Sequence, residues 1–162
     1  MEGLTIRRLT IGRLIERLKR IYFILLLFVA FSASAEMPFR GAWIATVANI
    51  DWPSEEAVGN DSLQQSEMLF LLDSLESLGI NAIIFQVRPT ADALYRSKYE
   101  PVSHWLTGKQ GDSLTYDPLE WTIEQAHKRG MEVHVWLNPY RVNLAKTDTS
   151  VICADHVWRK HR

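Results

Sequence analysis

The chain has 162 residues, with 18 Lys and Arg against 19 Asp and Glu, and 47% of its residues are hydrophobic, enough to bury a core. The first 35 residues hold six of the 18 basic residues and two of the 19 acidic ones, which leaves 12 against 17 and a net charge of −5 for the rest. Because phosphate binding needs clustered basic side chains, this acidic portion argues against a nucleic-acid partner. The single Cys153 excludes an internal disulfide, so packing alone must hold the fold together.

Residues 1–35 have the order of parts of a secretory signal peptide. A basic run ends at Arg20, the apolar stretch IYFILLLFVAF follows, and small residues stand at Ala33 and Ala35. We predict cleavage between Ala35 and Glu36 and an exported protein in the periplasm or cell envelope. The alternative is a permanent membrane anchor, but the apolar stretch falls short of the roughly 20 residues that span a bilayer.

Residues 36–162 are predicted to form one domain that begins with a strand, a helix and a second strand. The first strand is FRGAWIATV, residues 39–47. The stretch SLQQSEMLFLLDSLESLG has helical apolar spacing, with Asp61 or Ser62 as the N-cap and Gly79 as the stop. The second strand, INAIIFQVR, is apolar until Gln86 and Arg88.

A long connection, residues 89–116, separates the second strand from a second helix and a third strand. The helix DPLEWTIEQAHKRG starts at the N-cap Asp117, has Pro118 at its first position and stops at Gly130. In the third strand, EVHVWLN, aliphatic residues alternate with His134, Trp136 and Asn138.

The order β-α-β-α-β, with apolar strands of the kind that are buried on both faces, predicts a parallel α/β sheet. Either an open doubly wound sheet or a (β/α)8 barrel fits this order. A nucleotide-binding doubly wound fold would place a glycine-rich turn after the first strand, and TVANIDWPS lacks one. We therefore predict the N-terminal part, about three βα units, of a TIM-type barrel.

In such a barrel the carboxyl ends of the strands form the ligand-binding rim. The second and third strands become polar there, and Asn49, Asp51 and Trp52, just after the first strand, are expected on the same rim. The connection is longer than the usual βα loop of about 2–6 residues. It is expected to build a binding wall from Tyr95, Tyr99, His104 and Trp105.

Three long motifs resemble the N-terminal part of the glycosyl hydrolase-like 10 family: FRGAWIATVANIDWPS, FQVRPTADALYRSKYEPVSHWLTGKQG and YDPLEWTIEQAHKRGMEVHVWLNPYRV. The resemblance covers about Pro38 to Val142. It implies an exported bacterial (β/α)8-barrel protein that cleaves the glycan strands of peptidoglycan, with a polysaccharide as its partner.

The chain departs from that family pattern in two ways. A barrel needs about 250 residues, so the resemblance implies that the catalytic acids follow later strands. The lipoprotein cysteine that many members carry is not found after the apolar stretch. The tail, residues 143–162, shows no strong helical period and reads as an early stop, a frameshift or a partial gene product.

Glycoside hydrolysis usually needs two carboxyl groups that flank the bond. The expected rim offers Asp51, Asp92 and Glu100, but none lies in a strand end, so we name no catalytic acid in this chain. His104 and His127 lack partners at metal-ligand spacing, and we expect neither a metal nor a cofactor. His134 is expected to be a hydrogen-bonded interior histidine.

Saccharide binding is the better-supported role for the rim, and eight residues are candidates: Trp43, Gln86, Arg88, Asp92, Trp136, Asn138, Tyr140 and Arg141. Arg88 should meet a carboxylate on a neighbouring strand, on a later segment of the barrel or on the substrate, for example the lactyl group of muramic acid. Asn138 can donate to and accept from a sugar hydroxyl, or cap the turn before Pro139. The indoles can stack on a pyranose or fill the core. Asp92 could instead cap a helical turn.

The sequence leaves two functional classes open. One is an exported glycoside hydrolase that cuts cell-wall glycan by two-carboxylate acid–base chemistry. The other is a carbohydrate-binding or scaffold protein without turnover, or an inactive fragment whose three strands cannot close a barrel. The oligomeric state is not predicted.

Overall fold

The computed structural model describes residues 15–24, 38–145 and 148–161. The chain divides into two units, Met1–Pro38 and Phe39–Arg162. In the first unit residues 15–24 are helical, while the predicted cleavage site lies outside the described residues. Among the described helices, none combines the length and the apolar character needed to cross a membrane. All that follows concerns the second unit.

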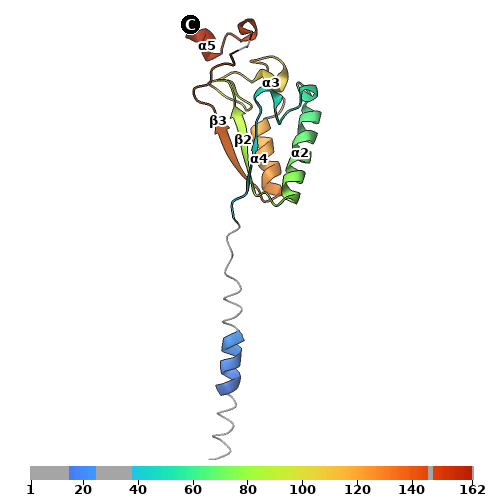
Figure 1. The fold of residues 1–162 in the computed structure, drawn as a ribbon, viewed down its shortest axis with the longest axis vertical. Helices are drawn as coiled ribbons and strands as arrows, with labels where there is room; N and C mark the ends of the chain where they lie inside the picture. Colours follow the sequence, from blue (N-terminus) through green and yellow to red (C-terminus); the bar gives the residue numbers. More distant parts are fainter. Residues whose placement is uncertain (1–14, 25–37, 146–147, 162) are drawn as a thin grey trace, which may run out of the picture. The chain divides into compact units, whose positions relative to one another are not determined.

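Three strands form one parallel sheet in the order β1-β2-β3 (Figure 1). They are β1 (Gly41–Ile44), β2 (Ala82–Arg88) and β3 (Glu132–Leu137). The predicted parallel α/β arrangement is confirmed. β1 is shorter than predicted because the chain turns after Ile44, where the amides of Asp51 and Trp52 both donate to the carbonyl of Ala45.

Two long helices, α2 (Asp61–Ser77) and α4 (Pro118–Lys128), follow β1 and precede β3. The N-cap of α2 is Asn60, whose side chain accepts from the amide of Leu63, so the prediction of Asp61 or Ser62 was one or two residues late. The Asp117 cap of α4 is confirmed, since its carboxylate accepts from two amides of the first turn.

Both long helices end in the same way. Gly79 and Gly130 have positive φ angles of 72° and 69°, a conformation that costs glycine little. In each case the next amide bonds back five residues, Ile80 to the carbonyl of Leu75 and Met131 to that of Ala126. These two turns reverse the chain so that the following strand joins the sheet in parallel.

The core lies between the sheet and the helices, which cover one of its faces (Figure 1). Ile44, Ile83, Phe85 and Val87 point into it from β1 and β2 and are each 1% exposed or less. Buried helix residues meet them, chiefly Met68 and Leu72 of α2 and Ala126 of α4.

β3 departs from the expectation of burial on both faces. Val135 and Leu137 are 50% and 47% exposed. β3 pairs with β2 alone within the described sheet, so its side chains have a neighbouring strand on one side only.

Four short helices and a fifth at the end of the described chain complete the unit. They are η1 (Val47–Asn49), η2 (Glu55–Ala57), α3 (His104–Thr107), η3 (Thr149–Val151) and α5 (Val157–Lys160). α3 lies in the long connection, and η3 and α5 lie in the tail.

Candidate functional site

The carboxyl ends of the three strands are joined by one buried side chain, that of Gln86 on β2. Its Oε1 accepts from the amides of Thr46 and Val47, both at 2.9 Å, just after β1. Its Nε2 donates to Oδ1 of Asn138, just after β3, at 2.6 Å. Gln86 is fully buried. Because a buried amide without partners would be costly, these bonds fix the spacing of the three strand ends.

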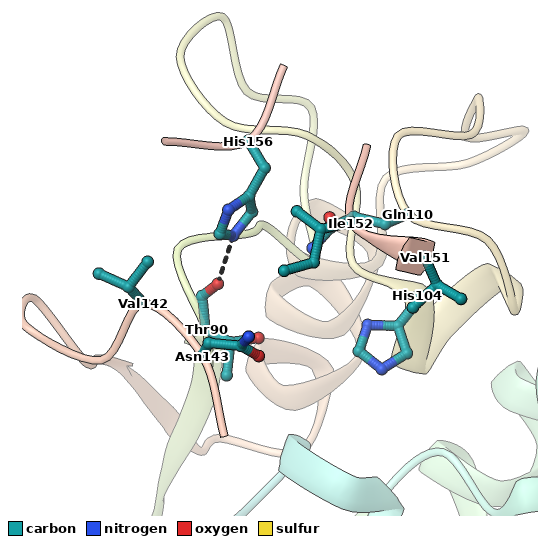
Figure 2. A pocket seen from close by; sticks show the side chains of 8 residues that line it. All are labelled: Thr90, His104, Gln110, Val142, Asn143, Val151, Ile152 and His156. Carbon is teal, nitrogen blue, oxygen red and sulfur yellow. Dashed lines mark hydrogen bonds between the residues drawn. The ribbon is translucent and has the colours of Figure 1, made fainter. Parts of the chain in front are cut away.

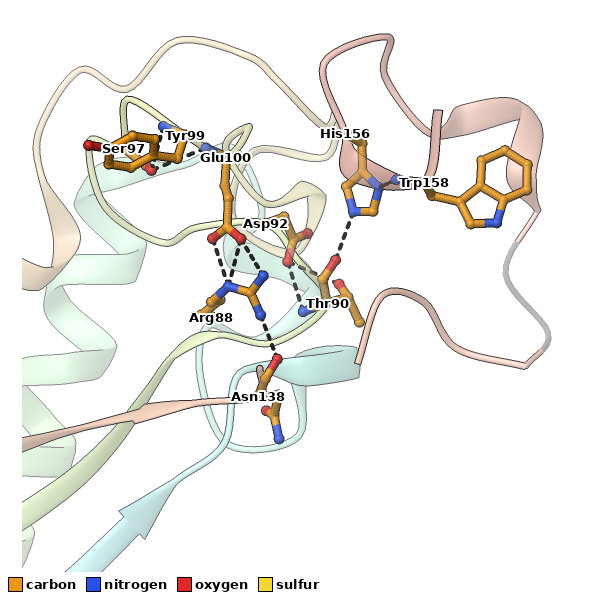
Figure 3. A network of polar contacts seen from close by, with 9 residues as sticks. All are labelled: Arg88, Thr90, Asp92, Ser97, Tyr99, Glu100, Asn138, His156 and Trp158. Carbon is orange, nitrogen blue, oxygen red and sulfur yellow. Dashed lines mark hydrogen bonds and ion pairs between the residues drawn. The ribbon is translucent and has the colours of Figure 1, made fainter. Parts of the chain in front are cut away.

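Arg88, two residues further along β2, forms an ion pair with Glu100 of the long connection (Figure 3). Its Nε lies 2.7 and 2.8 Å from the two carboxylate oxygens, and its Nη2 also donates to that carboxylate. Its Nη1 donates to the backbone carbonyl of Asn138 at 2.5 Å. The register between β2 and β3 shifts between Gln86 and Arg88.

The carboxylate that pairs with Arg88 is therefore neither on a neighbouring strand nor in a later segment of the barrel. It is an acid 12 residues further along the same chain, held in the fork that a guanidinium offers to a carboxylate. Both side chains are mostly buried, with 18% and 19% exposed. With Glu100 in place the charge of Arg88 is neutralised, so a substrate carboxylate is not needed to pair it.

Asn138 lies where the bonds of Gln86 and Arg88 meet. Its side-chain oxygen accepts from Gln86, its carbonyl accepts from Arg88, and its amide donates to the carbonyl of Arg88 at 3.0 Å. The three predicted site residues Gln86, Arg88 and Asn138 are thus brought together. Among the described hydrogen bonds, the one that its side chain makes runs to β2, and none caps the turn before Pro139.

Trp43 and Trp136 also meet, on the face of the sheet that the helices leave open. Their ring centroids are 5.1 Å apart and their planes are nearly perpendicular, at 82°. Trp43 is 64% exposed, so the core-filling alternative is wrong for it, and Trp136 is half-buried. Phe39 and His134 form a second edge-on pair at 5.5 Å.

His134 is not the interior histidine that the sequence predicted. Its side chain is 47% exposed, and its Nε2 lies 3.1 Å from Glu132. It shares the open face with Trp136, since alternate residues of a strand point to the same side. The expectation of burial assumed cover on this face, and no described helix lies over it.

Asp92 belongs to a separate, buried cluster in the long connection. Its Oδ1 accepts from the amide and the hydroxyl of Thr90, both at 3.0 Å, and its Oδ2 accepts from Gln110 at 3.3 Å. His104 approaches the same oxygen at 3.9 Å. The carboxylate is wholly buried, so it holds the connection together rather than facing a ligand.

Burial by itself raises the pKa of Asp92. The hydrogen bonds that it accepts from His104, Ser103 and Thr90 outweigh burial and hold the pKa below its usual value. Asp92 is therefore ionised at neutral pH. A general acid needs a raised pKa, so this residue is unsuited to protonate a leaving group.

The tail packs against this cluster. His156, 1% exposed, donates from Nε2 to the carbonyl of Thr90 at 2.8 Å, and the amide of Cys153 donates to Gln110 at 3.1 Å. A cavity of about 10 Å³ remains between the tail and the connection (Figure 2). Its lining includes His104, Asn143 and Ile152. The tail shows no helical period in its sequence, and these contacts were not predicted from it.

The residues just after β1 make contacts within the fold. Trp52 is 1% exposed and donates from its indole nitrogen to the carbonyl of Gln64 on α2. Asn49 donates to the carbonyls of Pro53 and Trp105, and Asp51 accepts from the amide of Ala45 at 2.7 Å. The prediction that Trp52 lines the rim was wrong, because its side chain is buried against α2, whereas the rim positions of the half-buried Asn49 and the exposed Asp51 stay predictions.

The remaining candidates lie beyond β3 and in the long connection. Tyr140 is 94% exposed and Arg141 is half-buried, and their roles stay predictions. In the connection Tyr99 is 88% exposed, while Trp105 stacks on His104 with centroids 3.9 Å apart. The sequence did not single out Thr46, Thr90, Gln110 or His156, because no local pattern marks a residue whose partner lies 18 to 66 positions away.

Comparison with known proteins matches this chain to one family. The model of the family described as "Glycosyl hydrolase-like 10" matches residues 38–162, so the match runs past the Val142 limit and includes the tail. Glycosyl hydrolase YngK of Bacillus subtilis (strain 168) is 46% identical over 130 residues, which are 80% of this chain and 25% of that protein. Glycosyl hydrolase DigH of Escherichia coli (strain K12) is 45% identical over 121 residues, 71% of this chain and 28% of that protein.

The chain thus spans about a quarter of the length of the curated relatives it matches. Its three parallel strands and intervening helices agree with the first units of a TIM-type barrel. By the extent of the match, the chain belongs to the glycosyl hydrolase-like 10 family.

Proposed function

We propose that this chain provides the first βα units of an exported glycoside hydrolase that acts on the glycan strands of bacterial peptidoglycan. Within it, the open face of the sheet and the strand ends bind the saccharide. The names of the relatives support a glycosidase-like protein, and the substrate and the chemistry are the proposal.

The convergence of Gln86, Arg88 and Asn138 at the carboxyl ends of the strands is the observation that carries the proposal, because that edge is the ligand-binding rim of a barrel. The exposed pair Trp43 and Trp136 adds a candidate stacking surface, since an indole face suits the apolar C–H face of a pyranose. Both residues lie on the open side of the sheet, and Asn138 follows Trp136 by two positions, just after the end of β3. A stacking group and a hydrogen-bonding group, both of which sugar recognition requires, are therefore close in sequence at the end of this strand.

The proposed chemistry is hydrolysis by a pair of carboxyl groups, one acting as acid and the other as base or nucleophile. The acids near the strand ends of this chain are already engaged: Asp51 by a backbone amide, Asp92 by the Thr90 cluster and Glu100 by Arg88. We therefore assign the catalytic pair to the part of the relatives' length that this chain does not cover. In the described segment the role is substrate binding.

Binding to purified peptidoglycan glycan strands tests the first half of the proposal. Trp43→Ala and Trp136→Ala should each lower the fraction of protein that sediments with the strands by fivefold or more, because each removes a stacking surface. Phe70→Ala is the matched control, since Phe70 is 76% exposed but lies on α2, on the helix side. Equal loss in all three variants, or in none, would contradict a saccharide site on the open face.

Release of new reducing ends from the same strands tests the second half. The 162-residue chain should bind without release, whereas a protein of the relatives' length should release them. Release by the 162-residue chain itself would place a catalytic pair among Asp51, Asp92 and Glu100. Binding without release by the longer protein would favour the alternative of a carbohydrate-binding protein without turnover.

A further inference from the structure

The orientation of the Gln86 side-chain amide is determined by two backbone amides that contact it. The amides of Thr46 and Val47 can only donate, and both point at one side-chain atom of Gln86 at 2.9 Å. That atom must be the oxygen. The nitrogen of the same amide, Nε2, therefore faces Asn138.

The orientation of Gln86 also determines the orientation of the Asn138 side-chain amide. Because Nε2 of Gln86 can only donate, the atom of Asn138 that it meets at 2.6 Å must be the oxygen. The oxygen of the Asn138 side chain is thus turned toward β2, where it accepts from Gln86. Its nitrogen is left as a donor, and Figure 3 shows it directed away from the Arg88 and Glu100 pair. Among the described residues, none accepts a hydrogen bond from this nitrogen.

The surroundings of this donor favour an uncharged ligand. The charge of Arg88, whose Nη1 donates to the carbonyl of Asn138, is neutralised by Glu100, so this cation does not call for an anionic ligand. Trp136 lies two positions before Asn138, on the open face of β3, with Trp43 against it. A donor at the end of a strand that carries an indole matches a neutral sugar that offers an oxygen acceptor.

We infer that Asn138 recognises an uncharged acceptor oxygen at carbon 2 of a sugar ring, an acetamido carbonyl or a hydroxyl oxygen, and that Gln86 is the positioning residue that sets this polarity. The inference rests on the proposed function and deepens it. From the sequence, Asn138 could donate or accept. The contact with Gln86 turns its oxygen toward β2, so the atom that faces outward is a donor.

Three tetrasaccharides separate the possible ligands by the group at carbon 2: N-acetylchitotetraose with an acetamido group, cellotetraose with a hydroxyl and chitotetraose with an ammonium, which can only donate. Isothermal titration of the full chain should give about tenfold tighter binding for N-acetylchitotetraose than for chitotetraose. Tighter binding of N-acetylchitotetraose than of cellotetraose would identify the acceptor as the acetamido carbonyl. Equal binding of those two would identify a hydroxyl oxygen.

Two substitutions replace the outward donor at position 138 by an acceptor, each in a different way. Asn138→Asp keeps the oxygen that Gln86 contacts and replaces the outward donor by an acceptor. Gln86→Glu presents an acceptor to Asn138, whose amide then rotates and turns its oxygen outward. Each should reverse the preference toward chitotetraose. A merely structural role for Gln86 would weaken binding of all three ligands alike.

Asn60→Asp is the matched control, because it makes the same change of charge at the N-cap of α2, where Asp caps as well as Asn. It should leave the preference unchanged. Gln86 is buried and its variant can fail to fold, but Asn138 is half-buried and its variant retains the contact with Gln86.

Two results would overturn the inference, and only the second would also overturn the proposed function. If the wild-type chain binds all three tetrasaccharides equally, or keeps its preference in Asn138→Asp, Asn138 does not recognise an acceptor, while saccharide binding stands. If the wild-type chain binds none of them and does not sediment with glycan strands, the proposed function fails as well.

Discussion

The two faces of the sheet are built from the same strands and differ in character, most clearly at β1 and β2, since Val135 and Leu137 of β3 are about half exposed. On the helix side, Ile83, Phe85 and Val87 are each 1% exposed or less. On the other side, Trp43 is 64% exposed and His134 remains about half exposed. Because successive residues of a strand point to opposite faces, one segment supplies both the core and a surface for recognition. The difference teaches that stability and binding can be altered independently in this chain.

The carboxyl ends of the strands resemble neither the buried face nor the exposed face of the sheet. Here the polar side chain of Gln86 is buried and bonded to three partner residues, while the half-buried Asn138 keeps an outward donor. Buried polar groups that are satisfied make an arrangement rigid, and a partly satisfied network would destabilise it. The rigid part of the site is thus the strand ends, and the exposed part is the indole pair.

The largest expected effect separates the two faces by stability. Phe85→Ala removes a wholly buried ring that packs against Trp52, at 5.6 Å between centroids, and should cost about 3–5 kcal/mol of unfolding free energy. Urea denaturation measures this loss. Trp43→Ala on the open face loses its edge-on contact with Trp136 and should change the same free energy by only about 0.5–1.5 kcal/mol. Similar losses in both variants would mean that the open face is covered in solution.

A smaller effect is expected from Asp92, and it depends on pH. The folded-state pKa of Asp92 lies below the usual 3.8, so its ionised form stabilises the fold above that pH, and this contribution is lost as the pH falls through the folded-state value. Asp92→Asn should cost about 1–3 kcal/mol at pH 7, because a buried, fully bonded carboxylate is replaced.

The difference between wild type and Asp92→Asn should shrink in urea titrations as the pH is lowered below about 4. Glu120→Gln is a suitable control, because Glu120 is an exposed acid on α4. A difference that is constant from pH 7 to pH 3 would show that the charge of Asp92 does not contribute to stability.

The smallest expected effect on stability concerns the ion pair at the rim. Glu100→Gln removes the charge that pairs with Arg88 but keeps an amide oxygen that can still accept from the guanidinium, so it should cost about 1 kcal/mol. The same change leaves the positive charge of Arg88 without its carboxylate at the strand ends. Binding of glycan fragments that carry the lactyl carboxylate of muramic acid should therefore strengthen severalfold, relative to neutral fragments. Unchanged selectivity in a titration would show that Arg88 lies out of reach of the ligand.

Much of the fold was predictable because its signals are local. The cap at Asp117 and the stops at Gly79 and Gly130 are read within one turn of helix, and all three are confirmed. The polar residues Gln86, Arg88 and Asn138 were expected together because parallel strands bring their carboxyl ends to one edge. The burial of Trp52 was not predictable, since the same indole could have pointed outward to the rim.

The sequence by itself determined the order of strands and helices, the parallel sheet and the residues that gather at its carboxyl edge, because periodicity and capping act between neighbours in the chain. Only the tertiary structure decided which of those side chains remain available. Glu100 takes the charge of Arg88, Gln86 binds the side-chain oxygen of Asn138, and His156 binds the carbonyl of Thr90. The physical reason is that hydrogen bonds and ion pairs depend on distance in space, and residues 12 to 66 positions apart acquire that distance only when the chain folds.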